Sequence, residues 1–200
     1  FTHEESSQLV SYLLKDTDLS KMGILICFYT GMRLGELCAL KWKDICLGEC
    51  LLKVTHTMQR LTMQDDTSAK TKIIITAPKT PSSKREIPLP DFLLQLIRNF
   101  YCEEKEAFFL TGKPDKFTEP RVMQYRFLKY TRECGVRPLN FHALRHTFAT
   151  QCVEMNFELK SLSEILGHSS VNITLNRYVH SSREMKKRNM DKLCLACKDI

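Results

Sequence analysis

The spacing of hydrophobic residues divides the chain into a β-rich middle and two helical ends. Before residue 45 and after residue 91, hydrophobic residues recur every three or four positions, which places them on one face of a helix. Between residues 45 and 89, short runs rich in β-branched residues indicate strands. We therefore expect a mostly α fold with a small antiparallel β-sheet (α+β), in which the sheet packs on, or projects from, a helical body.

Local signals place the ends of most helices. Thr2 and Glu5 form a capping box, so the first helix should follow Thr2 and reach about Lys15. Gly31 and Gly167 are suitable C-terminal stops. The predicted helices after the first one span about residues 19–31, 34–42, 91–100, 118–133, 141 onward, 159–167 and 171–178.

The predicted strands lie in three segments. Residues 50–58, 71–77 and 85–89 are rich in β-branched residues. The polar segment 59–70 predicts a hairpin loop between the first two, and residues 78–83 predict a second turn. Together these segments predict one antiparallel sheet of about three strands, which is too small to be stable by itself.

The length, net charge and cysteine content indicate a single-domain protein with reduced thiols and an anionic partner. Two hundred residues predict one domain that can bury a core without disulfides or metals. The chain has 30 Lys and Arg against 23 Asp and Glu, and the resulting net charge of +7 favours an anionic partner. The nine cysteines are odd in number and scattered through apolar stretches, as expected for reduced thiols in a cytoplasm.

The chain shows no sign of a membrane or secretory segment. No run approaches the ~18 apolar residues that a membrane span needs, and no signal peptide is visible. We therefore expect a cytoplasmic protein with no membrane partner. Because the chain opens at Phe1 without a methionine, we also expect a fragment from which an N-terminal partner domain is missing.

Four residues between positions 141 and 178 could together attack a phosphodiester. Arg145 offers a permanently charged fork that can hold two phosphate oxygens. His142 and His168 can exchange protons near neutral pH. Tyr178 can be a covalent nucleophile if a base helps it lose its proton. This combination suggests phosphoryl transfer on DNA.

Taken one at a time, these residues have simpler explanations. Tyr178 shares a helical face with apolar residues, as a core tyrosine does. His142 and His146 have the i, i+4 spacing of metal ligands. However, Ala143 stands where the zinc motif has glutamate, and no third ligand is apparent, so we expect no metal. The order of the motifs along the chain is more informative than any one of them.

Five motifs resemble those of the tyrosine recombinases, the phage and conjugative-transposon integrase family. Residues 29–45 (Tyr-Thr-Gly-Met-Arg-Leu-Gly-Glu-Leu-Cys-Ala-Leu-Lys-Trp-Lys-Asp-Ile) resemble its first arginine box. Residues 79–89 (Lys-Thr-Pro-Ser-Ser-Lys-Arg-Glu-Ile-Pro-Leu) are similar to the turn that holds its catalytic lysine. Its second box resembles His-Ala-Leu-Arg-His-Thr-Phe-Ala at 142–149, Leu-Gly-His-Ser-Ser at 166–170 and Asn-Arg-Tyr-Val-His at 176–180. The motifs follow the family order over nearly the whole chain, and the long hairpin is similar to that of mobile-element integrases.

The resemblance implies a division of labour around one DNA phosphate. Arg33 and Arg145 would hold the non-bridging oxygens of the scissile phosphate, neutralising charge that grows in the transition state. His168 would donate a hydrogen bond to one of these oxygens, and Glu36 would steady Arg33. Tyr178 would attack phosphorus, leaving a 3′-phosphotyrosine and a free 5′-hydroxyl.

Two proton transfers complete the implied reaction. An unperturbed tyrosine has a pKa of about 10, so it needs a base, and His142 is the candidate. Lys79 would protonate the departing 5′-oxygen, and the choice between Lys79 and the nearby Lys84 stays open. Because one phosphodiester is exchanged for another ester of similar energy, neither ATP nor a metal is required, and we expect no cofactor.

The C-terminal tail has a pattern of its own. One helical stripe in it consists of Met190, Leu193, Cys194 and Cys197. The stripe explains the two cysteines better than half a zinc site does, because no second pair lies at the right distance. We therefore divide the chain into a catalytic domain at residues 1–182 and a C-terminal tail or helix at residues 183–200.

The resemblance also implies partners. It implies double-stranded DNA, a homotetramer on that DNA with C-terminal segments exchanged between protomers, and a place at the bacterial nucleoid. Packing of the tail in cis is equally consistent with its stripe. An accessory DNA-bending or excision factor is a further candidate partner. The sequence does not identify that factor, the DNA site, the reaction direction or the host element.

Two alternatives keep the fold and change the function. A DNA-binding regulator could retain recombinase-like residues, but all six catalytic positions are filled, which argues against it. A type IB topoisomerase or telomere resolvase uses related chemistry without exchanging DNA partners. Formation of a covalent protein–DNA adduct would exclude the regulator, and strand exchange between duplexes would exclude the topoisomerase.

Overall fold

A computed structural model describes most of the chain. The described residues are 1–62, 71–78, 80–178 and 190. The predictions made for Lys79, and for the tail 183–200 apart from Met190, therefore lie outside the described residues. Within the described part of the chain, no helix is both long enough and apolar enough to cross a membrane.

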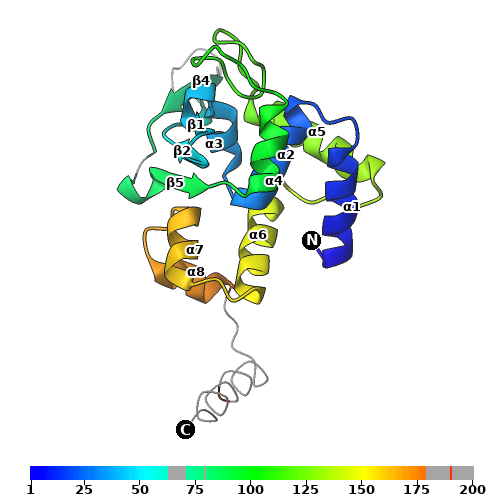
Figure 1. Ribbon diagram of the computed structural model, residues 1–200, viewed down its shortest axis with the longest axis vertical. Coiled ribbons are helices and arrows are strands. Elements are labelled where there is room, and N and C mark those ends of the chain that lie inside the picture. The colour runs from blue at the N-terminus through cyan, green and yellow to red at the C-terminus, as the bar shows by residue number, and fades with distance from the viewer. Residues whose placement is uncertain (63–70, 79, 179–189, 191–200) are drawn as a thin grey trace.

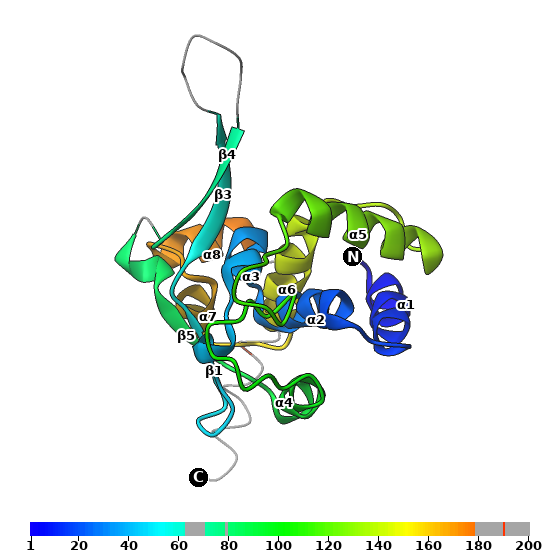
Figure 2. The ribbon, with the colours of Figure 1, turned by 90° about the horizontal axis from the view of Figure 1, so that it is seen from above.

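Two helices at the centre of the molecule organise the rest. Helices α2 (Leu19–Thr30) and α6 (His142–Glu154) pack against each other. Helices α1 (His3–Leu14) and α5 (Pro120–Glu133) lie on one side of them and the β-strands on the other (Figures 1 and 2). Every residue from 22 to 28 in α2 is buried, so this helix forms the middle of the hydrophobic core. The mostly helical fold with small antiparallel β-structure is confirmed.

The predicted helix boundaries agree with the capping geometry. The Glu5 backbone N–H donates to the Thr2 hydroxyl (3.1 Å), and the Thr2 N–H donates to the Glu5 carboxylate (2.8 Å). Helix α2 ends at Gly31, whose φ of 65° is in the left-handed region. The capping box and the glycine stop are therefore confirmed.

The β-strands form two antiparallel units, whereas the sequence predicts one sheet. In the first unit, β2 (Leu51–Val54) pairs with β1 (Ile45–Cys46) on one side and β5 (Arg85–Pro88) on the other. In the second, β3 (Thr57–Thr62) pairs with β4 (Thr71–Thr76) as a separate hairpin. This hairpin projects from the body of the molecule (Figure 2).

The predicted strand at residues 50–58 is wrong because the chain changes partner within it. The Thr55 hydroxyl donates a hydrogen bond to the Asp44 carboxylate (2.9 Å), and there the chain leaves β5 and turns toward β4. The loop predicted from residue 59 is also wrong for residues 59–62, which belong to β3. The hairpin projects from the body, so residues such as Arg60 and Leu61 are exposed and need not be apolar. The sequence pattern of a buried strand is therefore absent here.

Helix α3 (Leu34–Ala39) is shorter than predicted, because the chain pairs with a distant segment before reaching Trp42. The Trp42 N–H donates to the Ala107 carbonyl (3.0 Å), so the backbone leaves the helix. The Trp42 ring is then buried against Phe109, with ring centroids 5.1 Å apart.

The last helices form a smaller unit below the sheet. Helices α7 (Leu159–Leu166) and α8 (Val171–Tyr178) lie beside α6 (Figure 1). Their contact with α6 is made by a second hydrophobic cluster, which consists of Ala149, Cys152, Leu162 and Leu166. This unit carries two of the predicted site residues.

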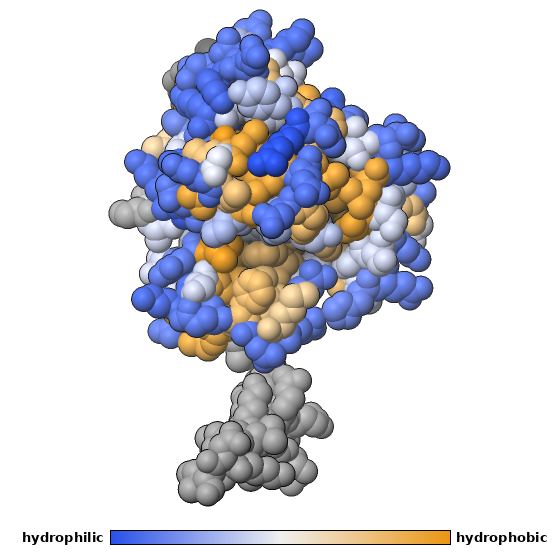
Figure 3. All heavy atoms as spheres, in the orientation of Figure 1, coloured by the Kyte–Doolittle hydropathy of each residue, from blue (hydrophilic) through white to orange (hydrophobic). Residues whose placement is uncertain are grey.

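Part of the hydrophobic surface stays uncovered. On the face shown in Figure 3, hydrophobic side chains gather across the middle between polar margins. The partly exposed large hydrophobic residues of the chain include Phe92, on α4 (Asp91–Arg98), and Met155 and Phe157, which follow α6.

Candidate active site

Arg145 is buried at the meeting point of three segments that are far apart in the sequence. It lies in the first half of α6, and its side chain is 3% exposed. Its Nη1 donates to the Gly31 carbonyl (2.8 Å) and its Nη2 to the Leu166 carbonyl (2.7 Å). Both carbonyls lie at helix C-terminal ends, where a cation is favoured by the helix dipole.

The Arg33 side chain also binds a carbonyl at the C-terminal end of α7. Arg33 directly precedes α3, and its Nη2 donates a hydrogen bond to the carbonyl of Gly167 (3.3 Å). Gly167 is the residue next to Leu166. The Arg33 side chain is 37% exposed. The structure therefore brings the guanidinium groups of Arg33 and Arg145 together on adjacent carbonyls, although the two residues are 112 positions apart in the sequence.

Glu36 is buried between two arginines. Its carboxylate accepts hydrogen bonds from Arg33 Nη1 (2.8 Å) and from Arg85 Nη1 and Nη2 (3.1 and 2.9 Å). Burial opposes ionisation, but the hydrogen bonds and charge of Arg85, followed by those of Arg33, hold the pKa of Glu36 below its ordinary value. Glu36 is therefore a carboxylate that fixes the orientation of Arg33.

The site carries an excess of positive charge. Burial, followed by the charges of Arg33 and Arg85, lowers the pKa of Arg145 from the ordinary arginine value. Three guanidinium groups face a single carboxylate, that of Glu36. A bound anion would relieve this repulsion, so the arrangement favours a phosphate.

His168 follows the end of α7 directly. Gly167 adopts a φ of 65° and ends the helix, which places His168 in the next position. The His168 Nδ1 lies 2.8 Å from the hydroxyl of Thr174, a fully buried residue of α8. This hydrogen bond at Nδ1 fixes the orientation of the His168 ring.

His142 and Arg33 open into one pocket. Its volume is about 270 Å³. The residues that line it are Met32, Arg33, Leu34, Gln124, Asn140, Phe141 and His142. The Asn140 side chain accepts a hydrogen bond from the Ala143 N–H (3.2 Å), which helps to begin α6 beside this pocket.

Tyr178 lies against His146, one helical turn from His142. The Tyr178 and His146 rings are 5.7 Å apart, and the His146 and His142 rings are 4.6 Å apart in an edge-to-face arrangement. Tyr178 is partly buried on the second hydrophobic cluster and also interacts electrostatically with Arg145. The phenol is thus near Arg145, while the His146 imidazole lies between it and the predicted base, His142.

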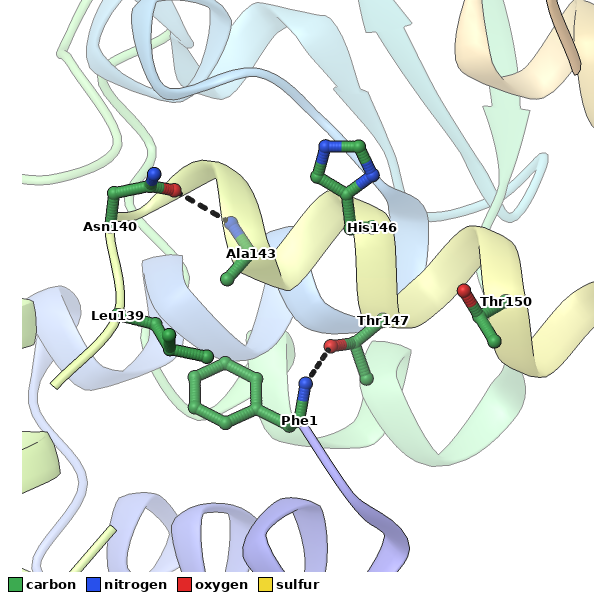
Figure 4. A pocket seen from close by; sticks show the side chains of 7 residues that line it. All are labelled: Phe1, Leu139, Asn140, Ala143, His146, Thr147 and Thr150. Carbon is green, nitrogen blue, oxygen red and sulfur yellow. Dashed lines mark hydrogen bonds between the residues drawn. The ribbon is translucent and has the colours of Figure 1, made fainter. Parts of the chain in front are cut away.

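A second pocket lies along α6 beside His146. Its volume is about 260 Å³. Figure 4 shows that His146 and the Phe1 ring lie at opposite edges of this pocket. The Phe1 amino group donates to the Thr147 hydroxyl (3.0 Å), so this pocket is bounded partly by the first residue of the chain.

Three residues of the site were not predicted to act in it. Arg85 appears in the sequence only as part of the lysine motif, and its partner Glu36 is 49 residues away. Thr174 has no distinguishing local pattern, and the sequence singles out His146 only for its metal-ligand spacing from His142. Of the two candidate lysines, Lys84 is exposed and Lys79 lies outside the described residues. Within the described ranges, no group of three His, Cys, Asp or Glu residues is placed to hold a metal ion.

Comparisons with known proteins agree on one family. Residues 1–185 match the model of the phage integrase family. The chain is 32% identical to a tyrosine recombinase XerC-like protein of Caldanaerobacter subterraneus, over 95% of this chain and 52% of that protein. It is 25% identical to the ICEBs1 integrase of Bacillus subtilis, with the same coverage. The chain spans about half the length of these curated relatives.

A solved structure supports the fold. The Tn1549 transposon integrase, in complex with a circular intermediate DNA, superposes with a TM-score of 0.77 at 24% identity. The match covers 96% of this chain and 65% of that one. A crystal structure of XerA recombinase gives a TM-score of 0.66 over 96% of this chain and 62% of that one, at 18% identity.

Proposed function

The chain belongs to the phage integrase family, and from this we infer that it is the catalytic domain of a site-specific tyrosine recombinase that breaks and rejoins DNA. The observation that carries the proposal is the convergence of Arg33 and Arg145 on adjacent carbonyls at the end of α7. A pair of guanidinium groups in a partly buried, positively charged site fits a phosphodiester better than an uncharged substrate.

The two arginines would hold the scissile phosphate by their remaining N–H groups. A guanidinium has five N–H donors, and Arg33 and Arg145 each use two of them in the contacts described above. The other donors can bind non-bridging oxygens, whose negative charge grows in the transition state. His168 would donate a further hydrogen bond to one of these oxygens, from a ring whose orientation is fixed by Thr174.

The proposed reaction conserves the number of phosphate ester bonds. Tyr178 Oη forms a bond to phosphorus while the bond from phosphorus to the 5′-oxygen breaks. His142 takes the phenol proton, and Lys79 gives a proton to the departing 5′-oxygen. A 5′-hydroxyl from another strand then attacks the 3′-phosphotyrosine and gives its proton to Lys79, while the bond from phosphorus to Tyr178 Oη breaks and His142 returns a proton to that oxygen. Neither ATP nor a metal is needed.

The position of Tyr178 implies a movement during this cycle. Its ring packs on His146, which is one turn of α6 from His142. Direct proton transfer to His142 would therefore require the Tyr178 phenol to move from His146 toward His142.

The proposal extends to the assembly. We assign residues 1–182 to the catalytic domain and residues 183–200 to a tail that is exchanged between protomers or packs in cis. The working form would be a homotetramer on double-stranded DNA at the bacterial nucleoid. The Tn1549 integrase, which shares the fold, was solved in complex with DNA, and this supports DNA as the partner.

A covalent-adduct assay tests the proposed function. The chain is incubated with a library of duplexes that carry randomised sequence around a defined nick, so that the broken strand cannot be resealed. We expect a covalent protein–DNA adduct that disappears in Tyr178→Phe. Tyr101→Phe is the matched control, because Tyr101 is exposed and packs on Trp42, and it should form the adduct.

The outcomes separate the alternative functions. If the unmodified chain forms no adduct, the regulator is favoured and tyrosine catalysis by this chain is excluded. If the adduct forms, but the chain only relaxes and reseals a supercoiled plasmid that carries a cleaved sequence, the topoisomerase is favoured. Exchange of strands between two duplexes is the result expected of a recombinase.

A further inference from the structure

The end of α7 is held by three arginines from three parts of the chain. The carbonyls of Ile165, Leu166 and Gly167 accept hydrogen bonds from Arg85 Nε (2.5 Å), Arg145 Nη2 (2.7 Å) and Arg33 Nη2 (3.3 Å), respectively. The last carbonyls of a helix lack intrahelical partners and form the negative end of its dipole. Cations are therefore favoured there, and each of the three arginines satisfies a different carbonyl.

Arg85 differs from the other two in how many of its donors bind protein groups. Its side-chain hydrogen bonds use four of the five guanidinium N–H groups, whereas Arg33 and Arg145 use two each. Arg85 is 5% exposed and therefore has little donor capacity left for a substrate. Its Nη1 and Nη2 bind the two oxygens of Glu36, while Nε binds the Ile165 carbonyl. Arg85 thus connects the carboxylate that orients Arg33 with the helix that ends beside Arg145 and His168.

Glu36 shows how closely the arginines are coupled. Its Oε1 accepts from Arg33 Nη1 and Arg85 Nη1, and its Oε2 accepts from the Arg33 N–H and Arg85 Nη2. Each oxygen is therefore shared between the two arginines. Loss of Arg85 would let Glu36 turn, and Arg33 would turn with it.

We propose that Arg85 is a positioning residue for DNA cleavage: it fixes Arg33, through Glu36, relative to the Arg145–His168 side of the site. This inference rests on the proposed function. Arg85 also donates to the Ser83 carbonyl (3.1 Å), so it fixes the end of the segment that begins with the candidate lysine Lys79. No contact of Arg85 with DNA is required.

The surroundings of Arg85 fit an arginine closely. A Cβ added at Gly167 would lie 3.0 Å from Arg85 Cδ and Nη1, so glycine there leaves room for the guanidinium. Only a planar fork can reach a carboxylate and a carbonyl in different directions at once. A lysine would keep the charge opposite Glu36 but would lose either the bidentate grip or the Ile165 contact.

The test compares Arg85→Lys and Arg85→Met with the unmodified chain. The rate of adduct formation is measured at saturating nicked duplex from the library, together with DNA affinity and the thermal midpoint. A misplacement of about 1 Å can cost about 100-fold in rate, so we expect about that loss for Arg85→Met and about tenfold or more for Arg85→Lys. Affinity should stay within about threefold, because the phosphate contacts themselves remain.

A matched control excludes a general effect of removing an arginine. Arg137 also pairs with a glutamate, but its side chain is 58% exposed and its partner Glu5 belongs to α1. Arg137→Met should cleave within about twofold of the unmodified chain. If Arg85→Lys is folded and cleaves at the unmodified rate, the positioning role is overturned. Loss of folding in both Arg85 variants would also overturn it, since Arg85 would then serve stability.

A double-mutant comparison shows whether Arg85 acts through Glu36. In a Glu36→Gln background, Arg85→Met should lower the rate by less than about threefold further, because the connection to Arg33 is already weakened. If Arg85→Met lowers the rate by the same factor in the Glu36→Gln background as in the unmodified chain, Arg85 acts independently of Glu36, which contradicts the inference. Absence of any adduct from the unmodified chain would instead overturn the proposed function, and with it this role.

Discussion

At the scale of single residues, the site is organised by side chains that are far apart in the sequence and share partners in space. Arg33, Glu36, Arg85 and Arg145 meet at the end of α7 through charge-assisted hydrogen bonds. Their motifs could be recognised from the sequence because residue types and order are local information. The Arg85–Glu36 pair could not, because nothing in either segment specifies a partner 49 residues away.

The buried arginine should not be replaceable by lysine. Arg145 uses two nitrogens to bind Gly31 and Leu166 and would use the others on phosphate. A lysine cannot do both. Arg145→Lys is expected to lower the cleavage rate by about 100- to 1000-fold while DNA affinity changes little. Arg98→Lys, at an exposed position of α4, is the control. Near-normal cleavage by Arg145→Lys would refute the clamp.

The two neighbouring histidines can be separated by their pH profiles. A general base must be neutral, so cleavage by the unmodified chain should fall toward acidic pH as the base is protonated. His142→Ala is expected to cleave about 100-fold more slowly. Its rate should also no longer fall at acidic pH. His146→Ala should keep the decline. If His146→Ala abolishes the decline and His142→Ala does not, His146 is the base.

The stability of the site should depend on acid through Glu36. Because its folded pKa lies below the unfolded value, ionised Glu36 stabilises the native state above about pH 4.3, and this contribution is lost as the pH falls through the lower folded pKa. Glu36→Gln should therefore lower the free energy of unfolding by about 3 kcal/mol at pH 7 and much less near about pH 3. Urea unfolding at both pH values measures the difference.

Glu106 supplies the control for this comparison. It pairs with Lys41 and Lys43 at the surface, where water screens the charges. Glu106→Gln should have a much smaller effect on stability. A Glu36→Gln penalty that is equal at both pH values would show that the charge of Glu36 is not what stabilises the site.

At the scale of elements, the helices could be predicted and the arrangement of strands could not. The Thr2 capping box and the glycines at 31 and 167 are local signals that the structure follows. The strands depend on pairing instead. A run rich in β-branched residues gives no sign that the chain will change partners at Thr55, because the alternative partners β4 and β5 lie elsewhere.

The packing of α3 on the projecting hairpin gives an element-scale test. A Cβ added at Gly35 would lie 2.6 Å from the Met58 carbonyl, which is backbone and cannot turn aside. Gly35→Ala should therefore lower stability by about 1–3 kcal/mol. Gly48→Ala is the control, because nothing lies within 4 Å of the added carbon. Equal melting temperatures for the two variants would show that α3 and β3 are not closely packed.

At the scale of the whole molecule, the positive charge of the chain indicates what kind of partner it binds. The net charge of +7 and the excess of guanidinium groups at the site both favour a polyanion. Neither the sequence nor the fold specifies which DNA sequence is bound, because base recognition depends on contacts that form only with DNA present.

The strength of DNA binding should depend steeply on salt. Each phosphate neutralised releases counterions, contributing about 0.9 to the slope of log affinity against log salt concentration. With several phosphates bound, we expect a slope of magnitude about 4 or more between about 50 and 200 mM salt. A titration of labelled duplex measures it, and a flat response would contradict a DNA-binding surface on this chain.

The central claim is that Tyr178 and the paired arginines act on the same phosphate. Its most direct test is peptide mapping of the covalent adduct by mass spectrometry after digestion of the protein and the DNA. We expect a nucleotide joined through its 3′-phosphate to the peptide that contains Tyr178. A nucleotide on any other residue, or no covalent adduct at all, would contradict the account.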